Sequence, residues 1–310
     1  MMQVLVIGYG SIGLRHSKVL QKLGCEVSIV SARKNAAQRI YSDINEAINT
    51  ENPKYIVIAN KTSEHIPTLV KIKKLGFNGD ILVEKPLSSN LLDIPSKDLG
   101  RVFVAYNMRF NPLIQRLSKE LKGETIISSQ AYVGQYLPNW RPSRDYRLSY
   151  SAKKDEGGGV LRDLSHELDF MNWIFGGWKR VVAMGGKFSD LEINSDDLFG
   201  LMFETKSCPL CLLQLNYLDR SSRRDIIINT NQHVFRIDFI NKTFEKDGVI
   251  IQFNHDSNYS YTMQHKAIIK REYENLCSFN EGREIVQLIN AAEKSAYLKN
   301  NDWINNEKNL

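Results

Sequence analysis

Short apolar runs alternate with amphipathic segments from residue 3 to about residue 106. The runs are continuous stretches of Val, Ile and Leu, which is typical of strands buried on both faces of a parallel sheet. The amphipathic segment that carries Leu14 and Leu20 stops at Gly24, as a crossover helix does. The strands that this pattern predicts are 4–7, 27–30, 55–59, 81–83 and 102–105.

After about residue 123 the apolar runs become longer and partly alternate with polar residues, which favours a mostly antiparallel sheet. One strong helix interrupts them at 160–175 and is closed by two glycines, and further helices are expected near 259–278 and 284–298. The strands predicted in this part are 125–133, 181–188, 198–203, 210–218, 225–229 and 234–239.

Length and composition agree with two soluble domains. A chain of 310 residues exceeds the usual single core of about 150 residues. We predict an α/β chain in which residues 1–106 form a Rossmann-type, doubly wound parallel sheet and residues 107–310 form an α+β domain with a large, open, mostly antiparallel sheet. Hydrophobic residues make up 42% and charged residues 25%, as in soluble globular proteins. The net charge of +6 is spread along the chain, so we expect no nucleic-acid partner.

The first residues and the cysteines exclude other classes. Met1 and Met2 lead directly into an apolar run, so we expect no secretory signal peptide. No apolar stretch reaches the roughly 20 residues of a membrane helix, and we expect a cytoplasmic protein without a membrane partner. The spacing of Cys208 and Cys211 suits half a zinc site or a redox pair, but Pro209 between two strand-like runs favours a hairpin turn, so we expect reduced thiols and no metal.

A glycine motif points to a dinucleotide. Gly8-Tyr9-Gly10-Ser11-Ile12-Gly13 directly follows the first predicted strand and opens a helix, which is the context that gives a GxGxxG match its meaning. Gly8 allows the tight turn, Gly10 the approach of the pyrophosphate and Gly13 the close packing of helix and strand, while Ser11 and Ile12 begin the helix whose N-terminus faces the phosphates.

The end of the second predicted strand bears on the choice of dinucleotide. An acidic residue there would bind the ribose 2′-hydroxyl of NAD and repel a 2′-phosphate. This chain has Ser31, Arg33 and Lys34 instead, and a hydroxyl with two cations suits the 2′-phosphate of NADP. The alternative is a solvated basic turn. We therefore expect NADP to be preferred over NAD.

Two segments carry candidate chemistry. Lys85 in Glu84-Lys85-Pro86 follows a predicted strand, which places it at the carboxyl edge of the sheet, where ligands bind in such folds. Three glycines at 157–159 precede the strong helix, on which Asp163 and His166 share one face because they are three residues apart. Taken alone, His166 is as consistent with a helix-face histidine as with a catalytic base.

At this point the chain resembles the Gfo/Idh/MocA oxidoreductases, which include glucose-fructose oxidoreductase and inositol 2-dehydrogenase. Landmarks of that family occur in the right order over nearly the whole chain. They are the glycine motif, Glu84-Lys85-Pro86, the Tyr106–Pro112 segment, the 157–169 stretch and the run 290–296.

The resemblance implies a Rossmann domain followed by a substrate-binding and oligomerisation domain whose open sheet packs against another copy, as a dimer or tetramer. It implies that His166 is the base, that Lys85 orients the hydroxyl, and that Asn60, His65 and Glu84 lie near the cofactor, with Arg109 near the substrate. One departure concerns Asp163: the family commonly places this Asp four residues before the His, a place that Arg162 holds here. Asp163 therefore stays a candidate catalytic residue of uncertain role.

The loop upstream of the three glycines is rich in cations and aromatics, and it predicts an anionic sugar or sugar nucleotide as substrate. The alternative is a solvated basic loop. We expect an NADP-dependent oxidoreductase acting on a secondary alcohol or ketone of such a sugar, and the loop resembles a family branch associated with surface-sugar biosynthesis. A reductase of a non-sugar substrate and a non-catalytic NADP(H) sensor are the rival hypotheses. The candidate substrate-binding residues of the loop are Trp140, Arg141, Arg144 and Tyr146.

Overall fold

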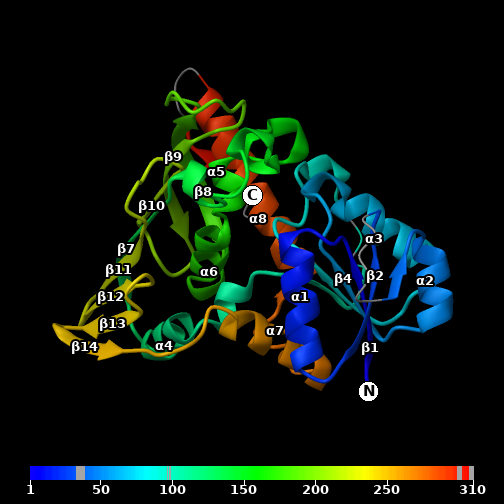
Figure 1. Ribbon diagram of the computed structural model, residues 1–310. Coiled ribbons are helices and arrows are strands. Elements are labelled where there is room, and N and C mark those ends of the chain that lie inside the picture. The colour runs from blue at the N-terminus through cyan, green and yellow to red at the C-terminus, as the bar shows by residue number, and fades with distance from the viewer. Residues whose placement is uncertain (33–38, 96, 98, 299–301, 307–310) are drawn as a thin grey trace. The chain divides into compact units, whose positions relative to one another are not determined.

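The computed structural model describes residues 1–32, 39–95, 97, 99–298 and 302–306, and it divides into two compact units. The first unit contains Met1–Phe110 and Asp256–Glu284, and the second contains Asn111–His255 and Ile285–Leu310. Figure 1 colours the returning segment of the first unit orange. The predicted boundary after residue 106 assigned Asp256–Glu284 to the second domain. This segment returns to the first unit because Cys277 and Ser278 pair with its sheet, and no local sequence pattern indicates that pairing.

The first unit is built on a seven-stranded sheet in the order β15-β6-β5-β4-β1-β2-β3. Strands β1 to β6 run parallel and β15 runs antiparallel to β6, so the predicted doubly wound parallel sheet is confirmed. The two strands that were not predicted are three and two residues long and carry no apolar run. The strands are β1 (Gln3–Ile7), β2 (Glu26–Val30), β3 (Arg39–Tyr41), β4 (Tyr55–Ile58), β5 (Asp80–Val83), β6 (Val102–Val104) and β15 (Cys277–Ser278).

Helices cover both faces of this sheet (Figure 1). The helices α1 (Ser11–Lys22) and α7 (Tyr259–Lys270) share one buried apolar core with the strands, while α2 (Ile44–Glu51) and α3 (His65–Lys74) lie on the other face. Helix α7 ends earlier than predicted because Arg271 turns into the left-handed region at φ 62°. The chain then leads into β15 and closes the edge of the sheet.

The second unit is built on a nine-stranded sheet in the order β14-β13-β12-β11-β7-β10-β9-β8-β16. All neighbouring strands are antiparallel except β7 and β10, which confirms the predicted mostly antiparallel sheet. The last hairpin and the short final strand were not predicted. The strands are β7 (Ile126–Gly134), β8 (Trp178–Gly186), β9 (Leu198–Thr205), β10 (Cys211–Asn216), β11 (Arg223–Thr230), β12 (Val234–Asp238), β13 (Thr243–Lys246), β14 (Val249–Gln252) and β16 (Ile304–Asn305).

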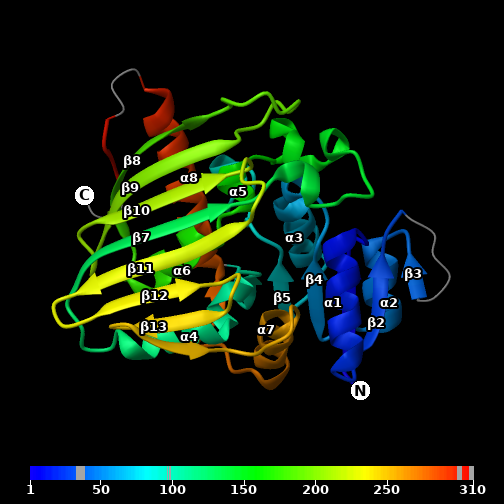
Figure 2. The same cartoon turned by 60° about the vertical axis from the view of Figure 1, so that its left-hand side comes forward.

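One face of this large sheet is covered by helices and the opposite face is not (Figure 2). Helices α5 (Val160–Asp163), α6 (His166–Ile174) and α8 (Phe279–Tyr297) lie on the covered face, and α4 (Pro112–Glu120) lies near the end that carries β13. Within the described ranges, no helix has the length and apolar character needed to cross a membrane.

The predicted hairpin turn at Cys208 and Cys211 is confirmed, since it joins the antiparallel strands β9 and β10. Thr205 and Cys208 close the turn, with the Thr205 N–H donating to the Cys208 carbonyl at 3.0 Å. Both thiols are free and buried. In the part of the chain that the structure describes, no group of three or more His, Cys, Asp or Glu side chains is arranged to hold a metal ion.

Candidate active site

The glycine loop between β1 and α1 has the shape that a dinucleotide requires. Gly8 has φ 98°, and a Cβ there would lie 2.5 Å from the carbonyl oxygen of Ala59. A Cβ on Gly13 would overlap the carbonyl oxygen of Gly8. These two glycines therefore allow the loop, the end of β4 and the start of α1 to pack closely.

Gly10 has a different role, because a Cβ there would meet no atom within 4 Å. Gly10 is the N-cap of α1, no side chain caps the helix, and its first turn, which includes Ser11 and Ile12, holds no acidic residue. Among the described residues, no side chain caps this helix N-terminus, so its partial positive charge is available to a ligand. This end of α1 fits the diphosphate of a dinucleotide.

Of the three residues predicted to favour NADP over NAD, the structure describes only Ser31. Ser31 directly follows β2 and is half-buried, with its backbone N–H donating to the carbonyl of Tyr41 at 3.0 Å. Arg33 and Lys34 lie outside the described residues.

Two buried polar atoms follow β4. The Asn60 side-chain amide donates to Thr68 Oγ1 at 2.9 Å, while Asn60 Oδ1 is buried and has no hydrogen-bond partner among the described residues. The His65 ring donates from Nδ1 to the Pro86 carbonyl at 3.0 Å. Burial lowers the pKa of His65, while the Pro86 and Asn60 carbonyls act against that shift, and Nε2 is buried with no well-aligned hydrogen bond among the described residues.

Buried polar atoms of this kind need hydrogen-bond partners. The hydroxyl and carboxamide groups of a nicotinamide nucleotide are such partners, so Asn60 and His65 fit the predicted cofactor.

Lys85 lies just beyond the carboxyl end of β5 and is half-buried. The preceding Glu84 is buried, and each of its carboxylate oxygens has a protein partner. Oε1 lies 2.7 Å from His16 Nε2, and Oε2 accepts the backbone N–H of Lys85 at 3.1 Å. Burial alone would raise the pKa of Glu84, but the hydrogen bond from His16 and the charge of Lys85 bring it below its usual value. Both oxygens of the Glu84 carboxylate are therefore engaged within the protein, and its contact with the cofactor stays a prediction.

Arg109 requires a correction. It lies in a short 3₁₀ turn, Asn107–Phe110, and its side chain is only 1% exposed. Its guanidinium is 2.7 Å from Glu281 Oε1, and Glu281 also accepts hydrogen bonds from the backbone and hydroxyl of Ser278. This buried ion pair within the first unit gives Arg109 a structural role in place of the substrate contact expected from the sequence.

In the second unit, the three glycines lead into two short helices rather than one. Helix α5 ends at Asp163 and α6 begins at His166, so the prediction of a single helix over 160–175 is wrong. The start of α5 is held by Asp196, whose carboxylate and carbonyl accept the N–H groups of Leu161 and Val160 at 2.9 and 3.0 Å. The spacing of Asp163 and His166 therefore does not place them on one face of a continuous helix.

Asp163 is buried and anchored by two tyrosines that the sequence did not indicate. Tyr217 donates its hydroxyl to Asp163 Oδ2 at 2.6 Å, and Tyr150 also hydrogen-bonds to this carboxylate. Burial raises the pKa of both phenols well above the usual value, so they stay protonated and donate. His166, by contrast, is half-buried at the start of α6.

In the aromatic and basic loop 140–147, some side chains contact other parts of the second unit and others are exposed to solvent. The Trp140 ring packs edge-on against Tyr217, with ring centres 5.2 Å apart, and the Tyr146 hydroxyl accepts the backbone N–H of Glu192 at 3.3 Å. Arg141 and Arg144 are exposed, and within the described ranges neither forms an ion pair. These two arginines are thus free to bind an anion.

Two stretches of the chain match models of known protein families. Residues 2–96 match the model described as "Oxidoreductase family, NAD-binding Rossmann fold", and residues 125–235 match the "GFO/IDH/MocA C-terminal domain". The chain belongs to the Gfo/Idh/MocA family of oxidoreductases. The resemblance noted in the sequence and the class of nicotinamide-dependent oxidoreductase are thereby confirmed.

Curated relatives are distant. The chain is 22% identical over 267 residues to an uncharacterized oxidoreductase of Streptococcus pneumoniae, which covers 78% of this chain and 71% of that protein. It is also 22% identical over 195 residues to 2,7-anhydro-N-acetylneuraminate hydratase of Mediterraneibacter gnavus, covering 58% of this chain and 51% of that protein. The match to the oxidoreductase YteT of Bacillus subtilis spans 42% of this chain and only 32% of YteT.

Solved structures share the fold over almost the full length. A levoglucosan dehydrogenase in complex with NADH has a TM-score of 0.83 at 16% identity, covering 98% of each chain. The WlbA dehydrogenase of Bordetella pertussis in complex with NADH and UDP-GlcNAcA has a TM-score of 0.79 at 17% identity, again covering 98% of each chain. At these identities the similarity shows the fold alone.

Proposed function

We propose that this protein is an NADP-dependent dehydrogenase or reductase that acts on a secondary alcohol or ketone of an anionic sugar or sugar nucleotide. The observation that carries the proposal lies in the first unit. There the uncapped N-terminus of α1 and the half-buried Lys85 both stand at carboxyl ends of parallel strands. Ligands bind at that edge in open α/β sheets.

In this proposal the dinucleotide lies with its diphosphate at Gly10, Ser11 and Ile12 and its nicotinamide half near Asn60 and His65. When bound, it supplies the acceptor or donor of a hydride. The preference for the 2′-phosphate form rests on Ser31, Arg33 and Lys34 in the sequence.

The chain's own residues handle the proton and the oxygen. In the oxidation direction, His166 accepts the hydroxyl proton while the hydrogen on the same carbon leaves as hydride. Lys85 hydrogen-bonds to the substrate oxygen and stabilises the negative charge that develops on it. Asp163, held by its two tyrosines, supplies a fixed negative charge beside α6. In reduction the same groups act in reverse, with His166 giving the proton.

The substrate class follows from the loop upstream of the three glycines. Arg141 and Arg144 supply the charge for a carboxylate or phosphate, and Trp140 and Tyr146 supply flat apolar faces for a sugar ring. Two proteins to which the chain is similar are associated with acidic sugars. One is the 2,7-anhydro-N-acetylneuraminate hydratase, and the other is the WlbA dehydrogenase in complex with UDP-GlcNAcA. A test panel should therefore include both acidic sugars and sugar nucleotides.

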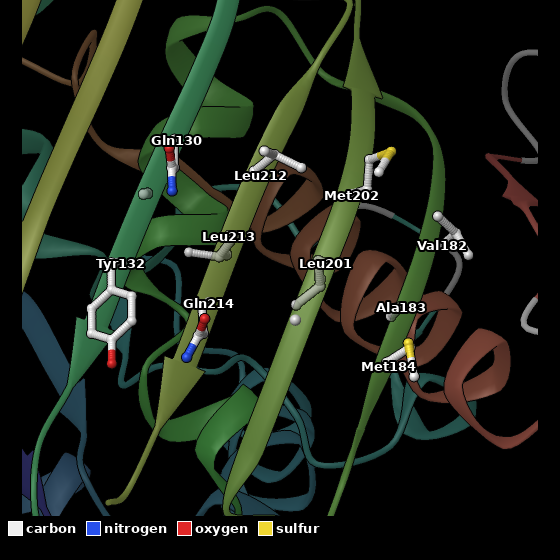
Figure 3. A pocket seen from close by; sticks show the side chains of 12 residues that line it. Gln130, Tyr132, Val182, Ala183, Met184, Leu201, Met202, Leu212, Leu213 and Gln214 are labelled. Atoms are coloured by element: carbon white, nitrogen blue, oxygen red, sulfur yellow. The ribbon is translucent and has the colours of Figure 1, made fainter. Parts of the chain in front are cut away.

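We also propose that the uncovered face of the nine-stranded sheet is buried by a second copy of the chain. Figure 3 shows a shallow hollow on this face, at the strands β7, β10, β9 and β8. The hollow is lined by Met184, which is 69% exposed, by Met202, which is 41% exposed, and by Leu212 on β10. An apolar sheet face of this extent is costly in water, and association with another copy would remove it.

The decisive experiment compares turnover and cofactor binding in Lys85→Ala and His166→Ala. Both variants should lose about 10²- to 10⁴-fold in kcat while NADPH affinity, measured by fluorescence, stays near wild type. Lys71→Ala and His233→Ala serve as matched controls, since both lie at exposed or half-exposed ion pairs elsewhere. Tight NADPH binding without turnover of any sugar by the wild type would favour the non-catalytic sensor instead.

A further inference from the structure

A chain of four polar side chains runs through the interior of the first unit and ends at Glu84. The Tyr55 hydroxyl lies 2.9 Å from His265 Nδ1. His265 Nε2 lies 2.8 Å from His16 Nδ1, and His16 Nε2 lies 2.7 Å from Glu84 Oε1. Tyr55, His265 and His16 are fully buried. The chain links β4, α7 and α1 to the segment that carries Lys85.

The number of protons on His16 decides how the protons are arranged along these groups, and we take the arrangement in which His16 carries one. Burial raises the pKa of Tyr55 well above its usual value, so the phenol keeps its proton and donates it to His265 Nδ1. Burial also holds the pKa of His265 well below its usual value, so the neutral ring carries its proton on Nε2 and donates to His16. His16 then accepts at Nδ1 and donates from Nε2 to Glu84. Every donor points toward the carboxylate.

Apolar core surrounds part of this chain, and burying polar groups there costs free energy. Residues of the same two helices, including Leu20, Ala267 and Ile268, pack as ordinary core. Burying a carboxylate costs free energy unless each oxygen is hydrogen-bonded, and aliphatic side chains would fill the same space without that cost.

We propose that Tyr55, His265 and His16 are positioning residues that hold Glu84 as a carboxylate, so that Glu84 Oε2 fixes the backbone of Lys85 and with it the place of this residue at the end of β5. The proposal rests on the catalytic role proposed above for Lys85. Besides His16, the groups that face Glu84 electrostatically are Lys85 from its own segment, His65 from α3, and Tyr55 and Tyr261 from β4 and α7.

The direction of the chain can be tested on the unmodified protein. Long-range proton–nitrogen NMR at pH 7.5 should show both rings, His16 and His265, protonated at Nε2 and unprotonated at Nδ1. A proton on Nδ1 of either ring, or a doubly protonated ring, would overturn the arrangement. This measurement needs no substrate and no variant that has to fold.

The effect on Lys85 is tested by trace acylation with acetic anhydride, read by mass spectrometry as the ratio of Lys85 to Lys71 labelling. In Glu84→Gln, which keeps the shape of the side chain but removes its charge, the ratio should rise about tenfold, because the Lys85 backbone loses a charge-assisted hydrogen bond and its segment opens to the reagent. His16→Asn should raise it similarly. Tyr273→Phe is the matched control, since it removes a phenol bonded to Asp80 outside the chain, and should leave the ratio unchanged.

An unchanged ratio in Glu84→Gln would refute the proposal even if the enzyme is active. If the ratio rises as expected, kcat for an identified sugar should fall at least tenfold in Glu84→Gln with the KM for NADPH unchanged. A rise in the ratio without any turnover by the wild type would leave the positioning of Lys85 established and remove the proposed catalytic function. Normal kcat in Glu84→Gln despite the raised ratio would show that the chain does not serve the reaction.

Discussion

The glycine loop before α1 offers a matched pair of substitutions that separate folding from dinucleotide binding. A methyl group added at Gly13 overlaps the carbonyl oxygen of Gly8, which is backbone and has little freedom to move. A methyl group added at Gly10 meets no atom within 4 Å, and the backbone at φ −78° and ψ −167° is one that alanine adopts without strain. Gly13→Ala should therefore weaken the fold, and Gly10→Ala only the ligand site.

The two effects differ enough to be measured separately. Overpacking against backbone at Gly13 costs about 1–3 kcal/mol, which lowers Tm by roughly 2–12 °C. At Gly10 the loss of a favourable N-cap and the gain from a less flexible unfolded chain nearly cancel, so Tm should stay within about 2 °C. The added methyl keeps the diphosphate from the helix N-terminus, and losing a hydrogen bond to a charged group, about 1.5–3 kcal/mol, weakens binding roughly 10- to 150-fold.

Thermal unfolding of the cofactor-free proteins and fluorescence titration with NADPH and NADH measure these quantities. Gln21→Ala is a suitable control, because Gln21 lies exposed on the same helix α1, at the end away from the glycine loop. It should change neither Tm nor affinity. Unaltered binding by Gly10→Ala would show that the diphosphate does not lie at this helix, and an unaltered Tm for Gly13→Ala would refute the close packing of the loop.

Three further outcomes are expected. Arg33→Ala should weaken NADPH binding more than NADH binding in the same titration, and an equal loss would remove the argument for the 2′-phosphate. Burial raises the pKa of Asp196 to about 6, so the stability it contributes is complete below about pH 4 and is lost as pH rises through 6. In chemical denaturation at pH 7, Asp196→Asn should therefore be more stable than wild type by about 2 kcal/mol, with no difference at pH 4. Met202→Lys should shift the mass measured by light scattering from oligomer to monomer, whereas a wild type that is monomeric at micromolar concentration would contradict the proposed interface.

Local sequence patterns were sufficient for the architecture and for the cofactor end of the site. Continuous Val, Ile and Leu runs identify strands buried on both faces, and a glycine motif between a strand and a helix has few structural solutions. The position of Lys85 follows in the same way, because a residue directly after a parallel strand must lie at the carboxyl edge of the sheet. In each case the information is contained within a few neighbouring residues.

Only the tertiary structure shows which side chains from distant parts of the sequence contact one another. The start of α5 is held by Asp196, which lies 35 positions after Leu161, and Asp163 is anchored by Tyr217. The burial of Arg109 depends on Glu281, which returns to the first unit from the far end of the chain.

The chain of hydrogen bonds behind Glu84 is the clearest case. His16 and His265 are 249 positions apart, and neither has a local pattern that distinguishes it from an ordinary helix histidine. A sequence pattern reports the periodicity of one element, whereas the partner of a buried polar group is set by which elements pack together. The fold and the cofactor loop could therefore be read from the sequence, and the supports of the catalytic candidates could not.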